Sequence, residues 1–200
     1  MTAMNPSGTL LGAAFPRASG NLLRGAIIIV LGSLLLTLSA KIQIPFYPVP
    51  LTLQTLVVLL IGATCGWRLG ALTVIAYMAQ GAAGLPVFAG TPEKGIGLAY
   101  MVGPTGGYLL GFVLAAAATG FLAERGFDRN PFTAFAAMIA GNALIYLPGL
   151  LWLGALLGWD KPILEWGFYP FLLGDLTKAA LGAALLPLAW KFVGRRNKHG

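Results

Sequence analysis

Residues 130–159 read NPFTAFAAMIAGNALIYLPGLLWLGALLGW and contain no charged side chain. A helix needs about 20 mostly apolar residues to cross the hydrocarbon core of a bilayer, so this stretch is long enough for one crossing. Pro131 suits the first turn of a helix. Pro148 is tolerated inside a membrane helix when neighbouring groups satisfy the carbonyl that it frees. The stretch therefore predicts a membrane-spanning helix over residues 131–158.

The same absence of charge recurs along the rest of the chain. No charged residue occurs over residues 25–40, 42–67, 69–92 or 95–123, and only Asp175 and Lys178 interrupt residues 166–190. Proline and glycine place the breaks between these segments. The pattern predicts further helices over residues 22–40, 51–66, 69–83, 104–123 and 168–191. The expected fold is an all-α integral membrane protein, a bundle of six transmembrane helices.

The composition excludes an ordinary soluble domain. Hydrophobic residues make up 58% of the 200 residues, the mean hydropathy is +0.81, and only 19 residues are charged (13 Lys and Arg, 6 Asp and Glu). The net charge of +7 is attributed to basic cytoplasmic loops and not to a nucleic-acid partner. We expect a single membrane domain over residues 22–192 in the lipid bilayer. Residues 1–21 are expected to form a mobile cytoplasmic tail, and residues 193–200 a basic cytoplasmic tail.

The distribution of basic residues predicts the orientation. Six spans place both termini on one side of the membrane. The loops on the other side hold three basic residues, and the tails and the remaining loops hold nine. The three are Lys41, Lys94 and Lys161; the nine are Arg17, Arg24, Arg68, Arg125, Arg129, Lys191, Arg195, Arg196 and Lys198. Because basic loops stay in the cytoplasm, both termini are expected to be cytoplasmic.

Three outward segments are least like lipid-facing helix: residues 44–50, residues 84–107 and the loop that leads into the last helix. Residues 44–50 contain three prolines, which remove N–H donors and favour extended backbone in the residues before them. Residues 84–103 form a glycine-rich loop whose first part, Gly-Leu-Pro-Val-Phe-Ala-Gly at residues 84–90, is rigid and rich in turns. Non-helical backbone at membrane depth is tolerated only where protein buries it or where it lines a cavity.

Trp67 and Arg68 are expected to form a tight turn at the membrane interface.

Asp175 and Lys178 are the unusual charges of the last helix. Three residues apart, they share one face of that helix, about 10 and 15 Å below its outer end. A charge at such depth costs about 2.5–3.5 kcal/mol on insertion scales. One interpretation is a self-neutralising pair that fixes helix packing. The other is an anion or polar-ligand site that opens to the outside, where a ligand carboxylate replaces the aspartate as partner of the lysine.

Other candidate sites are weaker. With one cysteine, Cys65, and one histidine, His199, the chain offers no metal cluster, no Ser-His or Cys-His pair and no expected cofactor. The membrane-embedded amides Gln54 and Asn142 either bridge helices or contact a ligand. A small-residue face formed by residues 25, 32 and 33 fits another helix of this chain or a partner protein. An intramembrane enzyme or a purely structural membrane subunit remains an alternative.

Four motifs resemble one family. They are IPFYPVPLTLQT at residues 44–55, GLPVFAG at 84–90, GPTGGY at 103–108 and GDLTK at 174–178. Their order and spacing resemble the BioY family, the biotin-binding S components of energy-coupling-factor (ECF) transporters. The resemblance covers about residues 22–192.

The resemblance implies a function and a set of site residues. The family's fold is a six-helix membrane protein that captures biotin from outside and works with a transmembrane coupling protein and cytoplasmic ATPase subunits; it is not an enzyme. The resemblance implies ligand contacts by Asp175 and Lys178, and a loop over the ligand that includes Phe88, Ala89 and Gly90. Tyr108 and Gln54 also match family motifs. An S component for another small vitamin is the alternative of the same class.

Overall fold

The computed structural model describes residues 8–15, 22–45, 47–91, 93 and 95–196; for residues 195 and 196 it describes the backbone alone. These residues are mainly helical. The helices are α1 Leu10–Ala14, α2 Leu22–Lys41, α3 Gln54–Cys65, α4 Trp67–Ala82, α5 Leu98–Met101, α6 Gly106–Ala123, the 3-10 helix η3 Phe127–Arg129, α7 Pro131–Leu157, α8 Ile163–Gly167 and α9 Tyr169–Arg196. Four segments are long and apolar enough to cross a membrane: Leu22–Lys41, Gly106–Ala123, Pro131–Leu157 and Ile163–Gly194.

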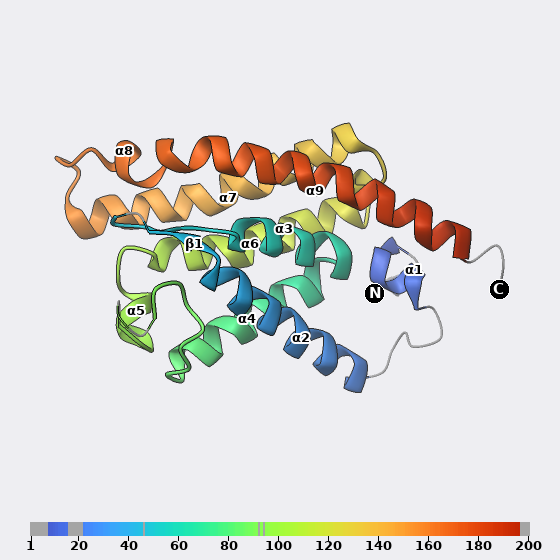
Figure 1. The fold of residues 1–200 in the computed structure, drawn as a ribbon, viewed down its shortest axis with the longest axis horizontal. Coiled ribbons are helices and arrows are strands. Elements are labelled where there is room, and N and C mark those ends of the chain that lie inside the picture. Colours follow the sequence, from blue (N-terminus) through green and yellow to red (C-terminus); the bar gives the residue numbers. More distant parts are fainter. Residues whose placement is uncertain (1–7, 16–21, 46, 92, 94, 197–200) are drawn as a thin grey trace, which may run out of the picture.

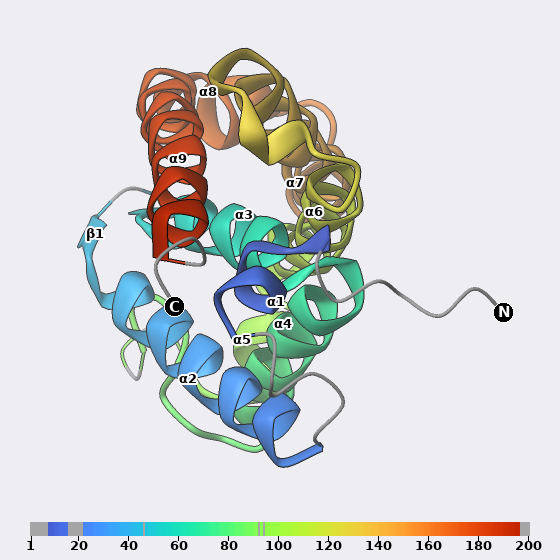
Figure 2. The same cartoon turned by 90° about the vertical axis from the view of Figure 1, so that its right-hand side faces the viewer.

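The helices form one bundle whose centre is α3 and α6. Figure 1 shows α7 and α9 running along one side of the bundle, with α2 and α4 along the other. In the end-on view of Figure 2, α3 and α6 lie between these two groups. Short connections join α3 to α4 and α6 to α7, whereas a long loop that includes α5 joins α4 to α6. Buried residues of α3, α4, α6, α7 and α9 pack together in the core of the bundle.

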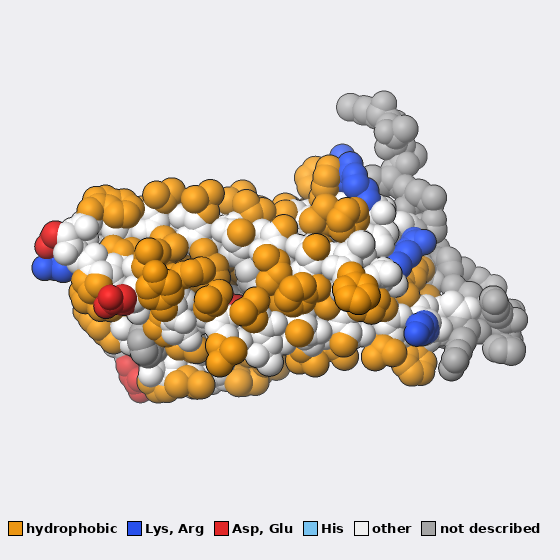
Figure 3. Space-filling model, turned by 90° about the horizontal axis from the view of Figure 1, so that it is seen from above, with side chains coloured by type: hydrophobic (Ala, Val, Ile, Leu, Met, Phe, Trp, Pro, Cys, Tyr) orange, Lys and Arg blue, Asp and Glu red, His pale blue; other side chains and the backbone are white. Residues whose placement is uncertain are grey.

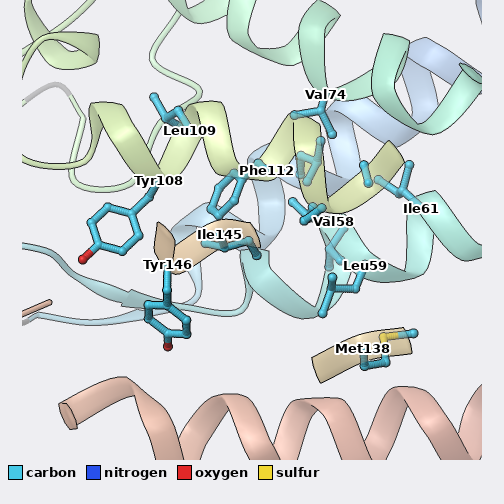
Figure 4. Close-up of a cluster of buried hydrophobic side chains, with 14 of the residues drawn as sticks. Val58, Leu59, Ile61, Val74, Tyr108, Leu109, Phe112, Met138, Ile145 and Tyr146 are labelled. Atoms are coloured by element: carbon cyan, nitrogen blue, oxygen red, sulfur yellow. The ribbon is translucent and has the colours of Figure 1, made fainter. Parts of the chain in front are cut away.

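Glycine allows the central helices to approach closely. A Cβ added at Gly62 of α3 would lie 2.3 Å from the carbonyl oxygen of Ala116 in α6. One added at Gly111 of α6 would lie 2.7 Å from the Cα of Ile145 in α7. Close backbone contact of this kind is the usual way in which membrane helices gain packing energy. Larger side chains, including Val58, Leu59, Phe112 and Met138, fill the space around these contacts (Figure 4).

A two-stranded hairpin precedes α3. Strands β1, Gln43–Ile44, and β2, Leu51–Thr52, pair antiparallel, with Gln43 opposite Thr52 and Ile44 opposite Leu51. The expectation that a helix begins at residue 51 was therefore wrong, because the prolines before it hold the chain extended and α3 begins only at Gln54. With 12 residues, α3 is about 18 Å long. Strand β2 of the hairpin leads directly into it.

The turn between α3 and α4 lies one residue earlier than expected. Gly66 has φ +86°, a conformation that favours glycine, and Trp67 is already the first residue of α4. The expected turn at Trp67 and Arg68 is therefore corrected to Gly66. The proline expected inside the helix at residue 148 lies within an uninterrupted α7.

The small-residue face of α2 packs within the chain. A Cβ at Gly32 would lie 2.5 Å from the methyl carbon of Thr73 in α4, and the Ser33 hydroxyl donates to Gln80 Oε1 at 2.7 Å. Of the two roles that the sequence allowed for this face, contact with another helix of the same chain is observed at Gly32 and Ser33, whereas a Cβ at Gly25 would meet nothing within 4 Å.

The structure describes part of each terminal tail. Residues 8–15, inside the stretch expected to be mobile, include α1, which packs against α3 and α9. Thr9 caps α1 by accepting from Gly12 N at 3.1 Å, and Arg24 of α2 donates to the carbonyl of Leu11 at 3.0 Å. The last helix continues to Arg196, past the expected end at residue 191. Residues 1–7, 16–21 and 197–200 lie outside the described residues.

Candidate functional site

Asp175 and Lys178 form the expected ion pair on α9. The distance from Lys178 Nζ to Asp175 Oδ1 is 2.8 Å, and the side chains are only 18% and 6% exposed for Lys178 and Asp175. Both groups therefore carry their charge in an environment with little water, where an unpartnered charge is costly. Their stability at this depth depends on the further hydrogen bonds that the surrounding helices supply.

The beginning of α3 supplies two of these partners. Lys178 Nζ donates to the backbone carbonyl of Thr52 at 2.7 Å and to Thr55 Oγ1 at 3.0 Å. The Thr55 hydroxyl in turn donates to Asp175 Oδ1 at 2.8 Å. The carbonyl of Thr52 lies within reach because the hairpin ends there and α3 starts two residues later. The change from extended to helical backbone thus places the Thr52 carbonyl and the Thr55 hydroxyl beside Lys178.

Helix α7 supplies the third partner of the aspartate. The hydroxyl of Tyr146 donates to Asp175 Oδ2, and Figure 4 shows the Tyr146 side chain pointing from α7 towards the last helix. Asp175 therefore accepts from Lys178 and Thr55 at Oδ1 and from Tyr146 at Oδ2. Hydrogen bonds to an ionised group are worth about 1.5–3 kcal/mol each, so this network offsets part of the cost of burying the ion pair.

The network forms one side of a pocket between α3, α6, α7 and α9. The pocket encloses about 530 Å³ of space between atoms, its opening included. One part is polar and the rest is aromatic and aliphatic. It is lined by Val49, Pro50, Thr52, Gln54, Thr55, Ala89, Tyr100, Thr105, Tyr108, Leu109, Phe112, Ile145, Tyr146, Phe171, Asp175 and Lys178. An apolar cavity with a few convergent polar groups is the usual form of a small-molecule site.

Five of the seven residues singled out in the sequence line this pocket: Gln54, Ala89, Tyr108, Asp175 and Lys178. Gln54 is buried and donates through Nε2 to the hydroxyl of Tyr77 at 2.8 Å. That hydroxyl donates to the carbonyl of Val87 at 3.0 Å, so Gln54 also supports the loop after α4. The hydroxyl of Tyr108 donates to the carbonyl of Gly167 at 2.8 Å.

Phe88 and Gly90 are not among the described lining residues of the pocket. Phe88 belongs to the loop after α4, and its side chain is fully buried. Its ring stacks on Tyr100 with centroids 4.7 Å apart and meets Tyr77 edge-on at 5.4 Å. A Cβ at Gly81 would lie 2.0 Å from this ring, so Gly81 leaves the space that the ring fills. Phe88 thus anchors the loop, and its neighbour Ala89 faces the pocket.

Lys41, the last residue of α2, holds the same loop from outside the pocket. Its Nζ donates to the carbonyl of Phe88 at 3.0 Å and to Thr91 Oγ1 at 3.0 Å. The Thr91 hydroxyl itself donates to the carbonyl of Phe88 at 2.7 Å. The loop that covers one side of the pocket is therefore fixed by a buried ring on one face and by a lysine on the other.

Several lining residues were not identified from the sequence as individual candidates. Thr55 lies inside a motif that had been noted, but nothing local showed that its hydroxyl reaches a residue 120 positions away. Tyr146 looked like one more aromatic residue in an apolar helix. The signal that could have identified it is its buried hydroxyl, because a tyrosine in a lipid-facing or core position needs a hydrogen-bond partner. The others are Val49, Pro50, Thr52, Tyr100, Thr105, Leu109, Phe112, Ile145 and Phe171.

The described residues contain no cluster of three or more His, Cys, Asp or Glu side chains that could hold a metal ion. The donor set of the pocket is one carboxylate, one ammonium group, hydroxyls and an amide. Such a set suits an organic ligand that carries both hydrogen-bonding groups and a negative charge.

Comparisons with known proteins agree with the sequence motifs. The sequence profile of the BioY family matches residues 10–195. The biotin transporter BioY of Thermotoga maritima is 41% identical over 158 residues, which cover 78% of this chain and 89% of that protein. The biotin transporter BioY of Rhizobium etli is 37% identical over 169 residues, covering 80% and 85%.

The fold agrees as well. It matches the crystal structure of the S-component for biotin from an ECF-type ABC transporter with a TM-score of 0.71 and 25% sequence identity, over 84% of this chain and 92% of the other. The relatives are transporters, in agreement with the expectation that the chain is not an enzyme. The family profile spans the hairpin, the loop after α4 and the network on α9, and from it we conclude that the chain belongs to the BioY family.

Proposed function

We propose that this chain is the biotin-binding, substrate-capture subunit of an ECF-type uptake transporter in a prokaryotic cell membrane. The observation that carries the proposal is the buried Asp175–Lys178 pair, held by Thr55 and Tyr146 at one side of a mostly apolar pocket. Membership of the BioY family, whose relatives are named biotin transporters, supports the same ligand.

The chemistry of biotin fits this arrangement. Biotin has an apolar ring system and chain, a ureido group with N–H donors, and a carboxylate. The walls formed by residues such as Tyr100, Phe112 and Phe171 suit the apolar parts. Lys178 is placed to neutralise the carboxylate or to hold the polar end of the ligand. Asp175 either accepts from the ureido N–H groups or orients Lys178.

Binding by partner exchange follows from the hydrogen-bond network. Lys178 has three partners in this structure, two neutral and one charged. When a ligand carboxylate replaces Asp175 as the charged partner of Lys178, the lysine keeps a charge-assisted hydrogen bond, which is about twice as strong as a neutral one. The Tyr146 and Thr55 hydroxyls keep Asp175 partnered while the lysine turns towards the ligand, so no charge is left alone in the pocket.

The membrane domain of the proposal is the single six-span unit over residues 22–192. Four spans correspond to the long apolar segments. The hairpin extends the short α3 towards the outer surface, and α4, with 16 residues, is about 24 Å long. The nine-to-three distribution of basic residues supports cytoplasmic termini. In Figure 3, Lys and Arg side chains gather at the end of the bundle where α9 ends, and hydrophobic side chains cover most of the face between the two ends.

Reporter fusions test this orientation. A reporter fused after Gly158 should lie outside the cell, and one fused after Gly200 should lie in the cytoplasm. An external signal from the second fusion would contradict the six-span arrangement.

Energy for uptake comes from partner proteins in this proposal. The sequence contains no nucleotide-binding motif, and the related S-component belongs to an ECF-type ABC transporter. The partners are a transmembrane coupling protein and cytoplasmic ATPase subunits. The chain captures biotin, and the partners drive its release to the cytoplasm.

The test is a titration of the detergent-purified protein with biotin, thiamin and riboflavin, preceded by mass spectrometry of any ligand that co-purifies. We expect biotin to bind at least 100-fold more tightly than the other two vitamins. Equal or tighter binding of another vitamin would show an S component of different specificity. Chemical conversion of bound biotin by the purified chain would point to an enzyme instead.

A further inference from the structure

A second hollow lies on the membrane-facing surface, away from the polar pocket. It is an open groove with about 1020 Å³ of space between atoms. The residues at its ends are large, and two alanines of α6 between them leave its middle hollow. It is lined by Trp67 of α4, Leu114, Ala117, Ala118, Phe121 and Leu122 of α6, and Leu144 of α7. None of these residues lines the pocket that contains Asp175. From Leu114 to Phe121 the groove follows α6 for about 10 Å.

Two arginines stand at one end of the groove, each over an aromatic ring that lines it. The Arg68 guanidinium carbon lies 4.9 Å from the centre of the Trp67 ring. The Arg125 guanidinium carbon lies 3.2 Å from the centre of the Phe121 ring, and Arg125 also donates to the carbonyl of Phe121 at 3.0 Å. Stacking on a ring face leaves the N–H edge of a guanidinium available to an anion.

The beginning of α4, which carries Arg68, packs closely against the end of α6, just before Arg125. A Cβ at Gly120 of α6 would lie 2.4 Å from the backbone nitrogen of Trp67, so the end of α6 touches the beginning of α4. Neither arginine forms an ion pair with any residue that the structure describes. The nearby Glu124 uses one carboxylate oxygen to accept from the Trp67 N–H at 3.2 Å, so it caps α4 and offsets only part of the two positive charges.

We propose that this groove binds one anionic phospholipid, with an acyl chain along residues 114–122 and the phosphate between Arg68 and Arg125. The two parts of the site match the two parts of such a lipid, since the groove is apolar and its end is cationic. Basic pockets between membrane helices recognise anionic headgroups in this way, and each arginine near a membrane surface adds about 1 kcal/mol. The guanidinium fork is also suited to phosphate.

Charge decides between the possible occupants. The headgroup of a zwitterionic lipid carries a positive charge beside its phosphate, so its attraction to the two arginines is weaker than that of an anionic headgroup. A second copy of this chain, related by a two-fold axis through the groove, brings two more arginines against the first two, and like charges in contact oppose association. The arginines also lie at the end where α1 packs and where basic residues gather, which is the cytoplasmic end in the proposed orientation; there the membrane surface is negatively charged. This inference does not depend on the identity of the ligand in the polar pocket.

The test is native mass spectrometry of the full chain with phosphatidylglycerol or phosphatidylcholine of identical acyl chains. We expect one phosphatidylglycerol to bind about tenfold more tightly than phosphatidylcholine. The double variant Arg68→Gln/Arg125→Gln should lose this preference. Arg129→Gln, which removes an arginine that stacks on Trp190 at the same end, is the matched control and should retain it. Excess inorganic phosphate should leave the bound lipid in place.

A second pair of variants tests the groove itself. Ala117→Phe fills the hollow and should reduce phosphatidylglycerol binding to the level of phosphatidylcholine. Ala184→Phe, on an exposed position of α9 outside the groove, should have no effect. Normal elution in detergent size-exclusion chromatography shows that each variant is folded. Equal binding of the two lipids to the unmodified chain would overturn the proposal. So would an unchanged preference in the double arginine variant, or a dimer that Ala117→Phe dissociates.

Discussion

Asp175 and Asp128 are both buried, but their surroundings are built differently. Asp175 lies in α9 beside a pocket, and a lysine, a threonine and a tyrosine from three elements donate to it. Asp128 lies in η3, where α6 turns into α7, and is 1% exposed. Trp190 Nε1 donates to its Oδ2, and within the described residues its Oδ1 has no hydrogen-bond partner.

The difference shows what each carboxylate does in the fold. Asp128 ties the connection between α6 and α7 to the far end of α9, and it lines neither of the two described pockets. Both carboxylate oxygens of Asp175 accept hydrogen bonds, and its neighbours line a pocket. Asp175 has several hydrogen-bond donors beside a pocket, so it can exchange one of them for a ligand and still be hydrogen-bonded. Asp128 has one side-chain donor within the described residues and lines neither described pocket, which fits a role in helix packing.

The largest expected effect comes from breaking the pair on α9. Lys178→Met and Asp175→Asn each remove a charged group that is proposed to contact biotin, and each leaves the other charge without its ion-pair partner, which costs about 3–5 kcal/mol of stability in a buried site. Because the ligand contact is lost, we expect biotin affinity to fall about 100-fold or more in each, measured by titration of protein that elutes normally in detergent size-exclusion chromatography.

The double variant Asp175→Asn/Lys178→Met separates ligand contact from packing. If the pair contacts biotin, the double variant does not recover affinity although its charges balance. Recovery to nearly normal affinity would make the pair a packing ion pair. Asp128→Asn is the matched control for the aspartate, and we expect it to change biotin affinity less than twofold.

A smaller effect is expected at Tyr146. Tyr146→Phe removes one hydrogen bond to the Asp175 carboxylate and leaves the ring in place against Phe168, whose centroid lies 4.9 Å away. Loss of one hydrogen bond to a charged group is worth about 1.5–3 kcal/mol, so we expect affinity to fall about tenfold or more. Tyr169→Phe, on an exposed tyrosine, is the control. Unchanged affinity in Tyr146→Phe would remove this tyrosine from the account of the site.

The loop over the pocket should respond through kinetics. Lys41→Met removes the hydrogen bonds from Lys41 to Phe88 and Thr91, while the Phe88 ring still anchors the loop. We expect biotin to dissociate about three- to tenfold faster, the effect of one or two exposed hydrogen bonds, when followed by displacement of labelled biotin. Lys161→Met, which loses only a surface ion pair with Asp160, should leave the rate unchanged. An unaltered rate in Lys41→Met would show that the lysine does not restrain the loop.

The smallest effect is the pH dependence of Asp128. Burial raises the pKa of this carboxyl, while the Trp190 hydrogen bond and the nearby Arg129 charge oppose the shift. The folded state therefore binds this proton more tightly than the unfolded chain. Its contribution to stability is present below about pH 4, the ordinary pKa, and is lost as the pH rises through the folded-state value.

Asp128→Asn removes that dependence. We expect the variant to unfold at an equal or higher temperature at pH 7, by at most about 4 °C, the effect of ~1 kcal/mol in a chain of this size. Thermal unfolding at pH 4 and pH 7 measures the difference. A large loss of stability at pH 7 would mean that the ionised carboxylate, and not its packing, holds the connection.

Hydropathy predicts the parts of this fold that depend on composition. The absence of charge over residues 130–159, with Pro131 at its start, places α7 to within one residue of its observed end. The Asp175–Lys178 pair is also readable from sequence, because two charges one turn apart in an apolar helix must meet. Both results depend only on neighbours along the chain.

The remaining features depend on contacts across the fold. The hairpin replaces the first turn of an expected helix because residues around Gln43 and Thr52 pair as antiparallel strands. Phe88 points away from the pocket because Gly81 leaves room for its ring, and no local pattern distinguishes that direction from its opposite. Tyr146 joins the site only because α7 and α9 pack side by side in the register that brings it to Asp175.

The structure of the purified chain with biotin bound tests the central claim most directly. The account predicts biotin between α3, α6, α7 and α9, with a polar group of the ligand within hydrogen-bond distance of Lys178 or Asp175 and the loop at Ala89 closed over it. Biotin bound elsewhere on the chain, with the Asp175–Lys178 network unchanged and no ligand in contact with it, would contradict the account.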